Sequence, residues 1–298
     1  MDWCILPAWW ESGTEVLEEP YLRRWNANEG ASLIDPGLTG TVAVVTGGNS
    51  GIGAAIAKAL AAQGALVAIH YLDAPPQDPG QPFRVRIAVP GEAGALKVAE
   101  EIRQAGGQAT LVSGDLTHPD TISKIFDHAE SAFGPVSVLV NNAAHCELPD
   151  TILSVTQASI DRHFRVNTRA AVLLMGEFIR RFRKHNLQTG RIISISTDAA
   201  QAFPTQIAYG ASKAALEAFT RSVAIEAGGF GITVNAIAPG PIQTGWIKPD
   251  LEEQVLPSIP LARLGTPEDI AGAVVFLASA QAGWLTGQVI KVSGGHAL

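Results

Sequence analysis

The residues of this chain best suited to chemistry are Tyr209 and Lys213, four positions apart in the segment YGASK. On a helix, residues at this spacing lie on one face, so the lysine ammonium can lie beside the tyrosine phenol. A neighbouring positive charge favours the phenolate and lowers the phenol pKa from about 10 toward the range of a general acid or base. Alone, the pair also fits a helix with a buried tyrosine and an exposed lysine.

A glycine-rich turn gives the second chemical signal. The mostly apolar residues 41–45 run into TGGNSGIG, residues 46–53, and then into AAIAKALAAQG. This order predicts a strand, a tight turn and a helix, the arrangement that places a pyrophosphate at a helix N-terminus. Gly47 permits the turn, Gly51 lets the backbone approach the phosphate, and Gly53 lets the helix pack closely on the strand.

With these two motifs, the chain resembles the short-chain dehydrogenase/reductase family over about residues 40–296. The other family motifs follow in order: GDL at 114–116, NNAA at 141–144, VN at 166–167, ISIST at 193–197 and APGPIQT at 238–244. The resemblance implies an oxidoreductase that interconverts a carbonyl and a secondary alcohol by hydride transfer with a nicotinamide cofactor. The catalytic residues that it implies are Asn167, Ser196, Tyr209 and Lys213.

The resemblance also implies a role for each of the four. Tyr209 exchanges the proton, and Lys213 binds the nicotinamide ribose and lowers the tyrosine pKa. Ser196 donates a hydrogen bond to the substrate oxygen, and Asn167 holds a water that links Lys213 to solvent. Negative charge develops on a carbonyl oxygen as hydride reaches its carbon, so preplaced donors stabilise the transition state most. This chemistry requires no metal, and we expect none.

The hydroxyl donor has two candidates. Counting back 13 residues from Tyr209, a common family spacing, gives Ser196, whereas the strand register of RIISIST indicates Thr197. We take Ser196 as the donor. Thr197 is then an ordinary residue at a strand end, with its hydroxyl satisfied by the backbone.

The resemblance further implies how the cofactor is held. Asp115 and Leu116 flank the adenine, Asn141 and Ala143 stabilise the central strand and line the cofactor, and residues 239–244 cover the nicotinamide carboxamide. Two alternatives stay open, because Asp115 could cap a helix that begins near His118 and NNAA could be only a turn. The full expected set is Gly47, Asn49, Ser50, Gly51, Ile52, Gly53, Tyr71, Asp115, Leu116, Asn141, Ala143, Tyr209, Lys213, Pro239, Gly240, Ile242 and Thr244.

The end of the second strand usually reads the adenosine ribose. An acidic side chain there selects NAD, and a basic group accommodates the phosphate of NADP. This chain has Tyr71 near that position, and its glycine turn supplies Asn49 and Ser50 rather than a basic residue. Arg84 and Arg86 could reach a phosphate or could lie in a solvated loop. Because the acid is missing, we expect NADP(H) rather than NAD(H).

Seven apolar segments alternate with segments of helical periodicity. The strand candidates are VAVVTGG, ALVAIHY, ATLVSGD, SVLVNNAA, RIISIST, TVNAIAPG and QVIKVSGG. Continuous apolar runs suit a parallel sheet covered on both faces, and the segments between them carry apolar residues at helical spacing. The sequence therefore predicts an α/β, doubly wound Rossmann fold of seven mostly parallel strands, with ligands at their carboxyl ends.

Two segments depart from this pattern. Residues 1–39 are acidic and hold four of the six tryptophans, unlike a signal or transit peptide. Residues 73–94 are rich in proline and glycine and form an insertion that we expect to be an ordered loop or a short hairpin. We expect a peripheral or disordered N-terminal extension, followed by a single catalytic domain over residues 40–298.

Composition argues against several other classes of protein. The 298 residues carry a net charge of −7, which gives no footprint for nucleic acid, and no apolar segment is long enough to span a membrane. Cys4 and Cys146 are too few for a disulfide framework and fit a reducing cytoplasm.

By family resemblance, the helices around Asn167 and Tyr209 form an interface of a homotetramer or homodimer.

The substrate pocket is the least specified part of the prediction. Candidate pocket residues are His145, Gln201, Phe203 and Trp246, a mixture compatible with 3-oxoacyl thioesters, sugars, cyclic ketones or other secondary alcohols. Two further functions stay open: a cofactor-binding regulator without turnover, and a lyase or epimerase that uses the same cofactor. The complete catalytic set favours the oxidoreductase.

Overall fold

The computed structural model describes residues 35–73, 84–85, 90–202 and 204–297, and Pro36–Leu298 form one compact unit. Its centre is a seven-stranded sheet in the order β4-β2-β1-β5-β7-β8-β9, in which every pair of neighbours is parallel. The strands are β1 (Val42–Thr46), β2 (Leu66–Tyr71), β4 (Gln108–Ser113), β5 (Val138–Asn141), β7 (Gly190–Ile195), β8 (Ile232–Pro239) and β9 (Val289–Val292). These are the seven predicted strands, and the predicted fold class is confirmed.

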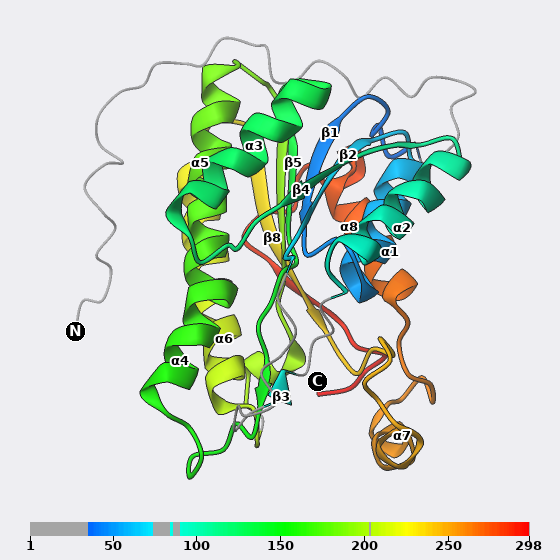
Figure 1. Ribbon diagram of the computed structural model, residues 1–298, viewed down its shortest axis with the longest axis vertical. Helices are drawn as coiled ribbons and strands as arrows, with labels where there is room; N and C mark the ends of the chain where they lie inside the picture. Colours follow the sequence, from blue (N-terminus) through cyan, green and yellow to red (C-terminus); the bar gives the residue numbers. More distant parts are fainter. Residues whose placement is uncertain (1–34, 74–83, 86–89, 203, 298) are drawn as a thin grey trace, which may run out of the picture. The chain divides into compact units, whose positions relative to one another are not determined.

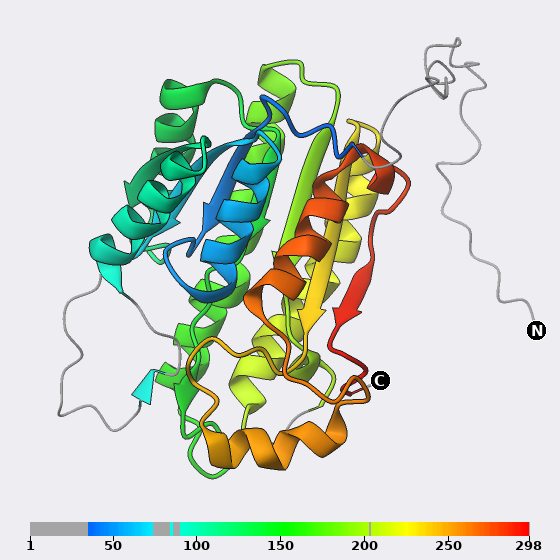
Figure 2. The same cartoon turned by 90° about the vertical axis from the view of Figure 1, so that its right-hand side faces the viewer.

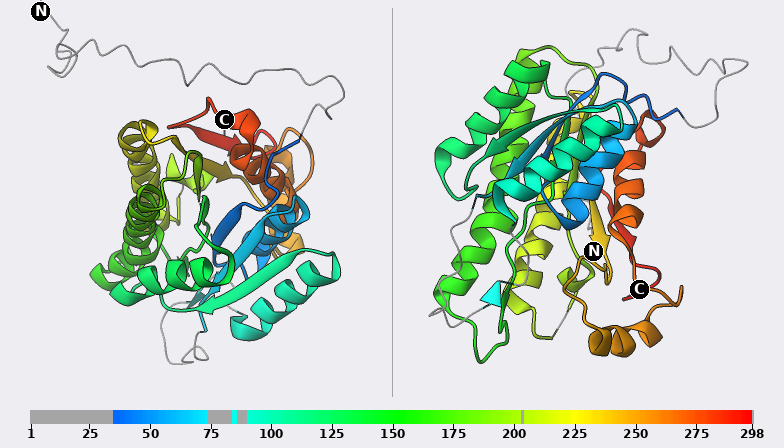
Figure 3. Two further views of the ribbon diagram at one scale, coloured as in Figure 1. Left: turned by 90° about the horizontal axis from the view of Figure 1, so that it is seen from above. Right: turned by 45° about the vertical axis from the view of Figure 1, so that its right-hand side comes forward.

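Helices cover both faces of the sheet (Figures 1 and 3). Alternate residues of β1 point to opposite layers, as a strand requires: Ala43 and Val45 belong to one core cluster, and Val42 and Val44 to the other. The first layer contains α1 (Gly51–Ala62), α2 (Gly91–Gln104) and α8 (Pro267–Ala278). The second contains α3 (Pro119–Phe133), α5 (Ala171–Lys184) and α6 (Ile207–Gly228).

One long helical pattern is interrupted at the predicted site. Helix α4 (Gln157–Phe164) passes through a π-helical segment, Arg165–Ala170, into α5. A π-helical turn inserts an extra residue into a helix and is common at functional sites. Here it carries Asn167, so it changes the direction in which this side chain leaves the helix.

The predicted insertion is only partly described. Its strand β3 (Arg84–Val85) pairs antiparallel with β6 (Glu147–Leu148), so this described part of the insertion joins a segment far away in the sequence. Helix α2 begins at Gly91, inside the predicted insertion. Arg86, like residues 1–34, lies outside the described residues.

A small apolar cluster lies beyond the carboxyl ends of the strands. In Figure 2 the arrowheads of β8 and β9 point toward α7 (Pro249–Val255). Ile247, Ile259 and Leu264 form the cluster's buried part, and Trp246 packs against it. Short 3₁₀ turns occupy Asp198–Ala200, Leu256–Ser258 and Ala280–Ala282.

Helix α6 is capped by a residue from another part of the chain. The buried Asp150 carboxylate accepts hydrogen bonds from the backbone N–H groups of Ala208, at 3.0 and 3.1 Å, and Tyr209, at 3.0 Å. The first N–H groups of a helix lack partners within it, and their positive end attracts a carboxylate. Asp150 therefore fixes the N-terminal turn of the helix that carries Tyr209 and Lys213.

We expect Asp150→Ala to lower the free energy of unfolding by about 2–3 kcal/mol, because it leaves buried N–H groups without an acceptor. Urea denaturation followed by circular dichroism measures the change. The matched control is Thr156→Ala, which removes the cap of α4, where Thr156 Oγ1 accepts from the Ser159 N–H at 3.1 Å. That control should cost about 1 kcal/mol. An Asp150 variant no less stable than the control would contradict this role.

Candidate active site

The glycine turn and the NNAA segment meet at the carboxyl ends of β1 and β5. Thr46 Oγ1 accepts from the backbone N–H groups of Asn142, at 3.0 Å, and Ala143, at 3.1 Å. Gly47 has φ +62°, and a Cβ on it would lie 3.0 Å from Ala143 Cα. A Cβ on Gly53 would overlap the Gly47 carbonyl oxygen. Both glycines are therefore required by the close approach of these segments.

The role expected of Asn141 belongs to its neighbour. The Asn142 side-chain N–H donates to the carbonyl oxygens of Thr46 at 2.9 Å and Gly47 at 3.0 Å, which ties the central strand to the turn. Both polar atoms of the Asn141 side chain are buried and have no hydrogen-bond partner among the described residues. The sequence motif is compatible with either asparagine in this role. Only the register of β5 against β1 decides which of the two faces the turn.

The residues around the turn fit a dinucleotide. Helix α1 begins at Gly51, directly after Ser50, so its first N–H groups lie where a pyrophosphate would bind. Gly51 has φ +49°, and a Cβ on it would lie 3.3 Å from Thr244 Cγ2. The predicted nicotinamide loop thus lies beside the predicted phosphate turn. Asn49 has another task, because its side-chain N–H donates to the Gly91 carbonyl at 3.1 Å and joins the turn to α2.

His70 is a structural residue of this site that the sequence analysis missed. It is buried at the end of β2, where its Nδ1 accepts from the Gly47 N–H at 3.4 Å and its Nε2 donates to the Gly114 carbonyl at 2.9 Å. Burial lowers the pKa of His70 to about 4, so the ring is neutral. Its neighbour Tyr71 is also buried.

Asp115 and Leu116 follow β4, as predicted. Asp115 Oδ1 accepts from the Thr117 N–H at 2.8 Å, and the N-cap residue of α3 is His118, which makes no side-chain capping bond. The alternative in which Asp115 caps α3 is therefore wrong. Leu116 is buried in the core between the sheet and α3.

Lys213 is buried inside the predicted active site. Its Nζ donates to the Ile195 carbonyl, at the end of β7, at 2.6 Å. Burial lowers the pKa of Lys213 to about 8, while the nearby Cys146 and Glu217 act in the opposite direction. Tyr209 lies one helical turn earlier on α6. The hydrogen bond to Ile195 therefore holds the Lys213 amine near the turn of α6 that carries Tyr209.

The Ser196 hydroxyl has an acceptor within the protein. Ile193 and Ile195 pack toward α1 and α8, so Ser196 points to the opposite face of the sheet. There its Oγ donates to Glu217 Oε1, on α6, at 2.6 Å. Thr197, the alternative that the strand register indicates, begins the turn Asp198–Ala200. Its Oγ1 accepts from the Ala199 N–H at 3.2 Å and donates to Asp198 Oδ1 at 3.3 Å.

Asn167 is held by backbone and side-chain bonds. Its Oδ1 accepts from the His145 N–H at 2.7 Å, and its Nδ2 donates to the His145 carbonyl and to Ser212 Oγ, both at 2.9 Å. Ser212 Oγ in turn donates to the Tyr209 carbonyl at 2.7 Å. Asn167 therefore joins the segment after β5 to the helix that carries Tyr209 and Lys213.

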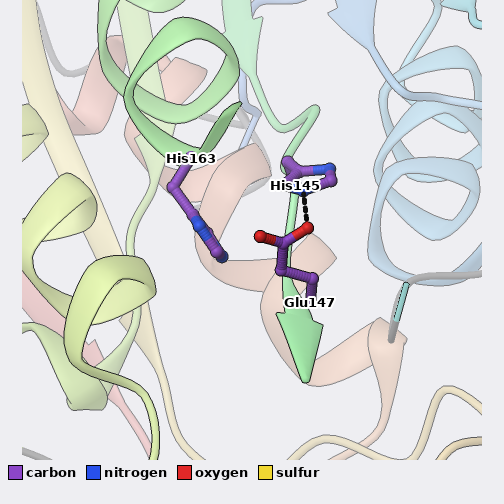
Figure 4. A group of neighbouring side chains, drawn as sticks. All are labelled: His145, Glu147 and His163. Atoms are coloured by element: carbon purple, nitrogen blue, oxygen red, sulfur yellow. Dashed lines mark hydrogen bonds and ion pairs between the residues drawn. The ribbon is translucent and has the colours of Figure 1, made fainter. Parts of the chain in front are cut away.

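A polar cluster of His145, Glu147 and His163 lies next to these residues (Figure 4). His145 Nε2 is 3.2 Å from Glu147 Oε2, and Arg162 donates to both Glu147 oxygens, at 3.0 and 3.1 Å. Burial lowers the pKa of His145. Burial alone would raise the pKa of Glu147, but its bonds to Arg162 and His145 lower it. Glu147 is therefore a carboxylate and His145 a neutral ring at neutral pH.

The other expected pocket residues lie apart from this cluster or outside the described residues. Gln201 is exposed, Trp246 packs against the cluster near α7, and Phe203 lies outside the described residues. His296 was not among the predicted site residues, and its Nδ1 is 2.6 Å from Asp198 Oδ2. Among the described helices, none has the length and apolar character needed to cross a membrane.

Comparison with known proteins identifies the family of this chain. A family model described as enoyl-(acyl carrier protein) reductase matches residues 80–297. The chain is 35% identical over 257 residues to the uncharacterized oxidoreductase YjdA of Bacillus subtilis, covering 85% of this chain and 96% of that protein. It is 37% identical over 266 residues to an NADPH-dependent aldehyde reductase-like chloroplastic protein of Arabidopsis thaliana, covering 87% and 95%.

Solved structures give the same result. A dehydrogenase/reductase from Sinorhizobium meliloti has a TM-score of 0.75 at 34% identity, covering 86% of this chain and 95% of that one. A 7α-hydroxysteroid dehydrogenase in complex with NADH and 7-oxo glycochenodeoxycholic acid has a TM-score of 0.77 at 34% identity, covering 87% and 95%. From its motifs, its fold and these relatives, the chain belongs to the short-chain dehydrogenase/reductase family of oxidoreductases.

Proposed function

We propose that this protein interconverts a carbonyl and a secondary alcohol by NAD(P)-dependent hydride transfer, with Tyr209 as the general acid/base. The observation that carries the proposal is the buried amine of Lys213, which lies one helical turn from Tyr209. Burial lowers the pKa of Lys213 to about 8. The glycine turn and Thr244 converge at the same edge of the sheet. A phosphate-binding turn and a proton-exchanging phenol are the two parts that this reaction needs.

Each proposed residue has a distinct task. When bound, the nicotinamide cofactor supplies or accepts the hydride. Tyr209 gives its proton to the substrate oxygen in reduction and takes it back in oxidation. The Lys213 ammonium favours the phenolate left behind, because an opposite charge nearby stabilises the ionised form. Asn167 keeps the segment after β5 and the start of α6 in fixed relative positions, which preserves the reactive geometry.

We expect Tyr209→Phe to abolish turnover, because a phenylalanine ring cannot exchange the proton. The assay measures the change in absorbance at the nicotinamide band when the purified protein is mixed with NADPH or NADH and a test substrate. The substrates are aldehydes, cyclic and aromatic ketones, 3-oxoacyl thioesters and oxidised sugars. The matched control is Tyr21→Phe, in the N-terminal extension, which should keep wild-type turnover. Substantial turnover in Tyr209→Phe would contradict the proposal, and cofactor binding without any turnover in the wild type would favour a regulator.

The cofactor is NADP(H) in preference to NAD(H) in this proposal. Support comes from Tyr71, which occupies the place of an acid that would select NAD, and from the relative in Arabidopsis thaliana that is named NADPH-dependent. The preference is measured as the ratio of kcat/KM for NADPH and NADH in the same assay.

We assign the hydroxyl donor to Thr197 rather than Ser196. Ser196 Oγ is committed to Glu217, a charged acceptor at 2.6 Å, and hydrogen bonds to charged groups are roughly twice as strong as neutral ones. Among the described residues, the Thr197 hydroxyl donates only a long bond, to Asp198 at 3.3 Å. It can therefore turn toward a substrate oxygen at small cost.

Thr197→Val should lower kcat by about 100-fold or more, the usual effect of removing one transition-state donor, with little change in KM. Ser196→Ala is the matched control. It removes a hydroxyl from the adjacent position and should lower kcat by much less than Thr197→Val, although it leaves Glu217 without its partner. If Ser196→Ala lost more kcat than Thr197→Val, the donor would be Ser196.

The proposal includes assembly as a homodimer or homotetramer. Large apolar side chains are exposed on the two helices concerned: Leu173 on α5, and Phe219 and Ile225 on α6. Exposed apolar patches on a folded protein commonly mark an interface.

We expect multi-angle light scattering to give two or four times the mass of one chain. Ile225→Glu, which places a charge on the 79%-exposed position of α6, should shift the protein toward monomer. Leu153→Glu, on the loop before α4 at 96% exposure, is the matched control and should leave the mass unchanged. A wild-type monomer at assay concentration would remove this part of the proposal.

A further inference from the structure

We propose that His145, Glu147 and His163 form a binding site for a divalent transition-metal cation of the Zn²⁺ class. No metal was expected from the sequence, because hydride transfer with a nicotinamide cofactor requires none. The inference goes beyond the proposed hydride transfer and does not depend on it, because it concerns binding to the protein alone.

The three ligand atoms already lie close together. The two imidazole nitrogens and one carboxylate oxygen are all within 4.8 Å of one another. Zinc bonds to nitrogen and oxygen of about 2.1 Å require neighbouring ligand atoms to be about 3.0–3.4 Å apart. His145 Nε2 and Glu147 Oε2, at 3.2 Å, meet this requirement. The His163 ligand nitrogen lies within 4.8 Å of both atoms, so the site closes when the ligands move toward one another (Figure 4).

His163 has an unused lone pair in a fixed direction. Its Nδ1 lies 2.9 Å from the Ser159 carbonyl oxygen. Because a carbonyl oxygen only accepts hydrogen bonds, the His163 proton is on Nδ1. The lone pair is therefore on Nε2, which is fully buried and has no hydrogen-bond partner among the described residues. A ring whose other N–H donates to a backbone carbonyl is the usual arrangement of a metal-binding histidine.

Glu147 keeps room for a metal despite its ion pair. A carboxylate has about four lone-pair positions, of which Arg162 uses one on each oxygen. The third bond comes from His145 Nε2. When the His145 proton moves from Nε2 to Nδ1, the Nε2 lone pair and the Glu147 oxygen can both bind a cation. Arg162 can keep its two bonds to Glu147. The Arg162 charge opposes binding, and we expect micromolar rather than nanomolar affinity.

The ligand types select the class of metal. Two imidazoles and a carboxylate suit Zn²⁺, Co²⁺, Ni²⁺ or Fe²⁺, whereas Mg²⁺ and Ca²⁺ prefer oxygen ligands alone. Three protein ligands leave at least one position open. The His163 ring meets the Tyr209 ring edge-on, with centroids 6.3 Å apart, so a bound cation lies in the neighbourhood of the proposed acid/base.

The test is a titration of the purified full-length protein with Zn²⁺ against a chromophoric chelator. We expect one equivalent to bind, and His163→Leu and His145→Asn each to weaken binding by at least about 100-fold, beyond the 10–100-fold typical of outer-shell changes. The matched control is His185→Asn, which removes another His–carboxylate pair, His185 with Glu130 at 3.3 Å. The control should bind Zn²⁺ like the wild type.

A second readout separates this site from the two cysteines. Protein loaded with Co²⁺ should show d–d bands without the charge-transfer band of a thiolate ligand. Circular dichroism checks the fold of each variant, and His145→Asn keeps the test decisive because that side chain lies at the partly exposed rim. The proposal is overturned if no stoichiometric binding occurs, if His145→Asn binds like the wild type, or if the thiolate band appears.

Discussion

The active-site region depends on a buried amine. Removing a charged amine from water is costly unless other groups compensate, and at Lys213 the direct compensation is the Ile195 carbonyl at 2.6 Å. This bond exists only if the end of β7 and the second turn of α6 hold their relative positions. Burial lowers the pKa of Lys213 to about 8, so the amine remains mostly charged at neutral pH. The packing of a strand against a helix thereby sets the electrostatics next to Tyr209.

Helix α6 is held at its start from two directions. Asp150 accepts from the first N–H groups of the helix, and Thr168 Oγ1, from the π-helical segment, donates to the Ser212 carbonyl at 2.7 Å. Asn167, in the same segment, donates to Ser212 Oγ. The extra residue of a π-helical turn changes which side chains face a neighbouring helix. It lets Asn167 and Thr168 reach α6 together.

His145 connects the two parts of the site. Its backbone N–H and carbonyl hold the Asn167 amide, while its side chain joins Glu147 and His163. His145 therefore belongs both to the proposed cation site and to the network that positions α6. A cation could alter the active-site region through this path without contacting Tyr209.

Local pattern and chain order determined the fold class and the positions of the main motifs on its elements. The seven strands follow from apolar runs that suit a parallel sheet buried on both faces, and the glycine turn and YGASK follow from spacing along single elements. Because parallel strands end at one edge, their order also predicted where the motifs meet.

Only the tertiary structure decided how individual polar side chains are used. Ser196 faces Glu217, Asn142 rather than Asn141 holds the turn, and Asp150 caps a helix that begins far along the chain. The pairing of β3 with β6 and the gathering of His145, Glu147 and His163 belong to the same group. Each depends on the register between distant elements or on a loop conformation. In a strand, a single-residue shift in register reverses the direction of every side chain, and the sequence pattern of one element does not fix its register or contacts with a distant one.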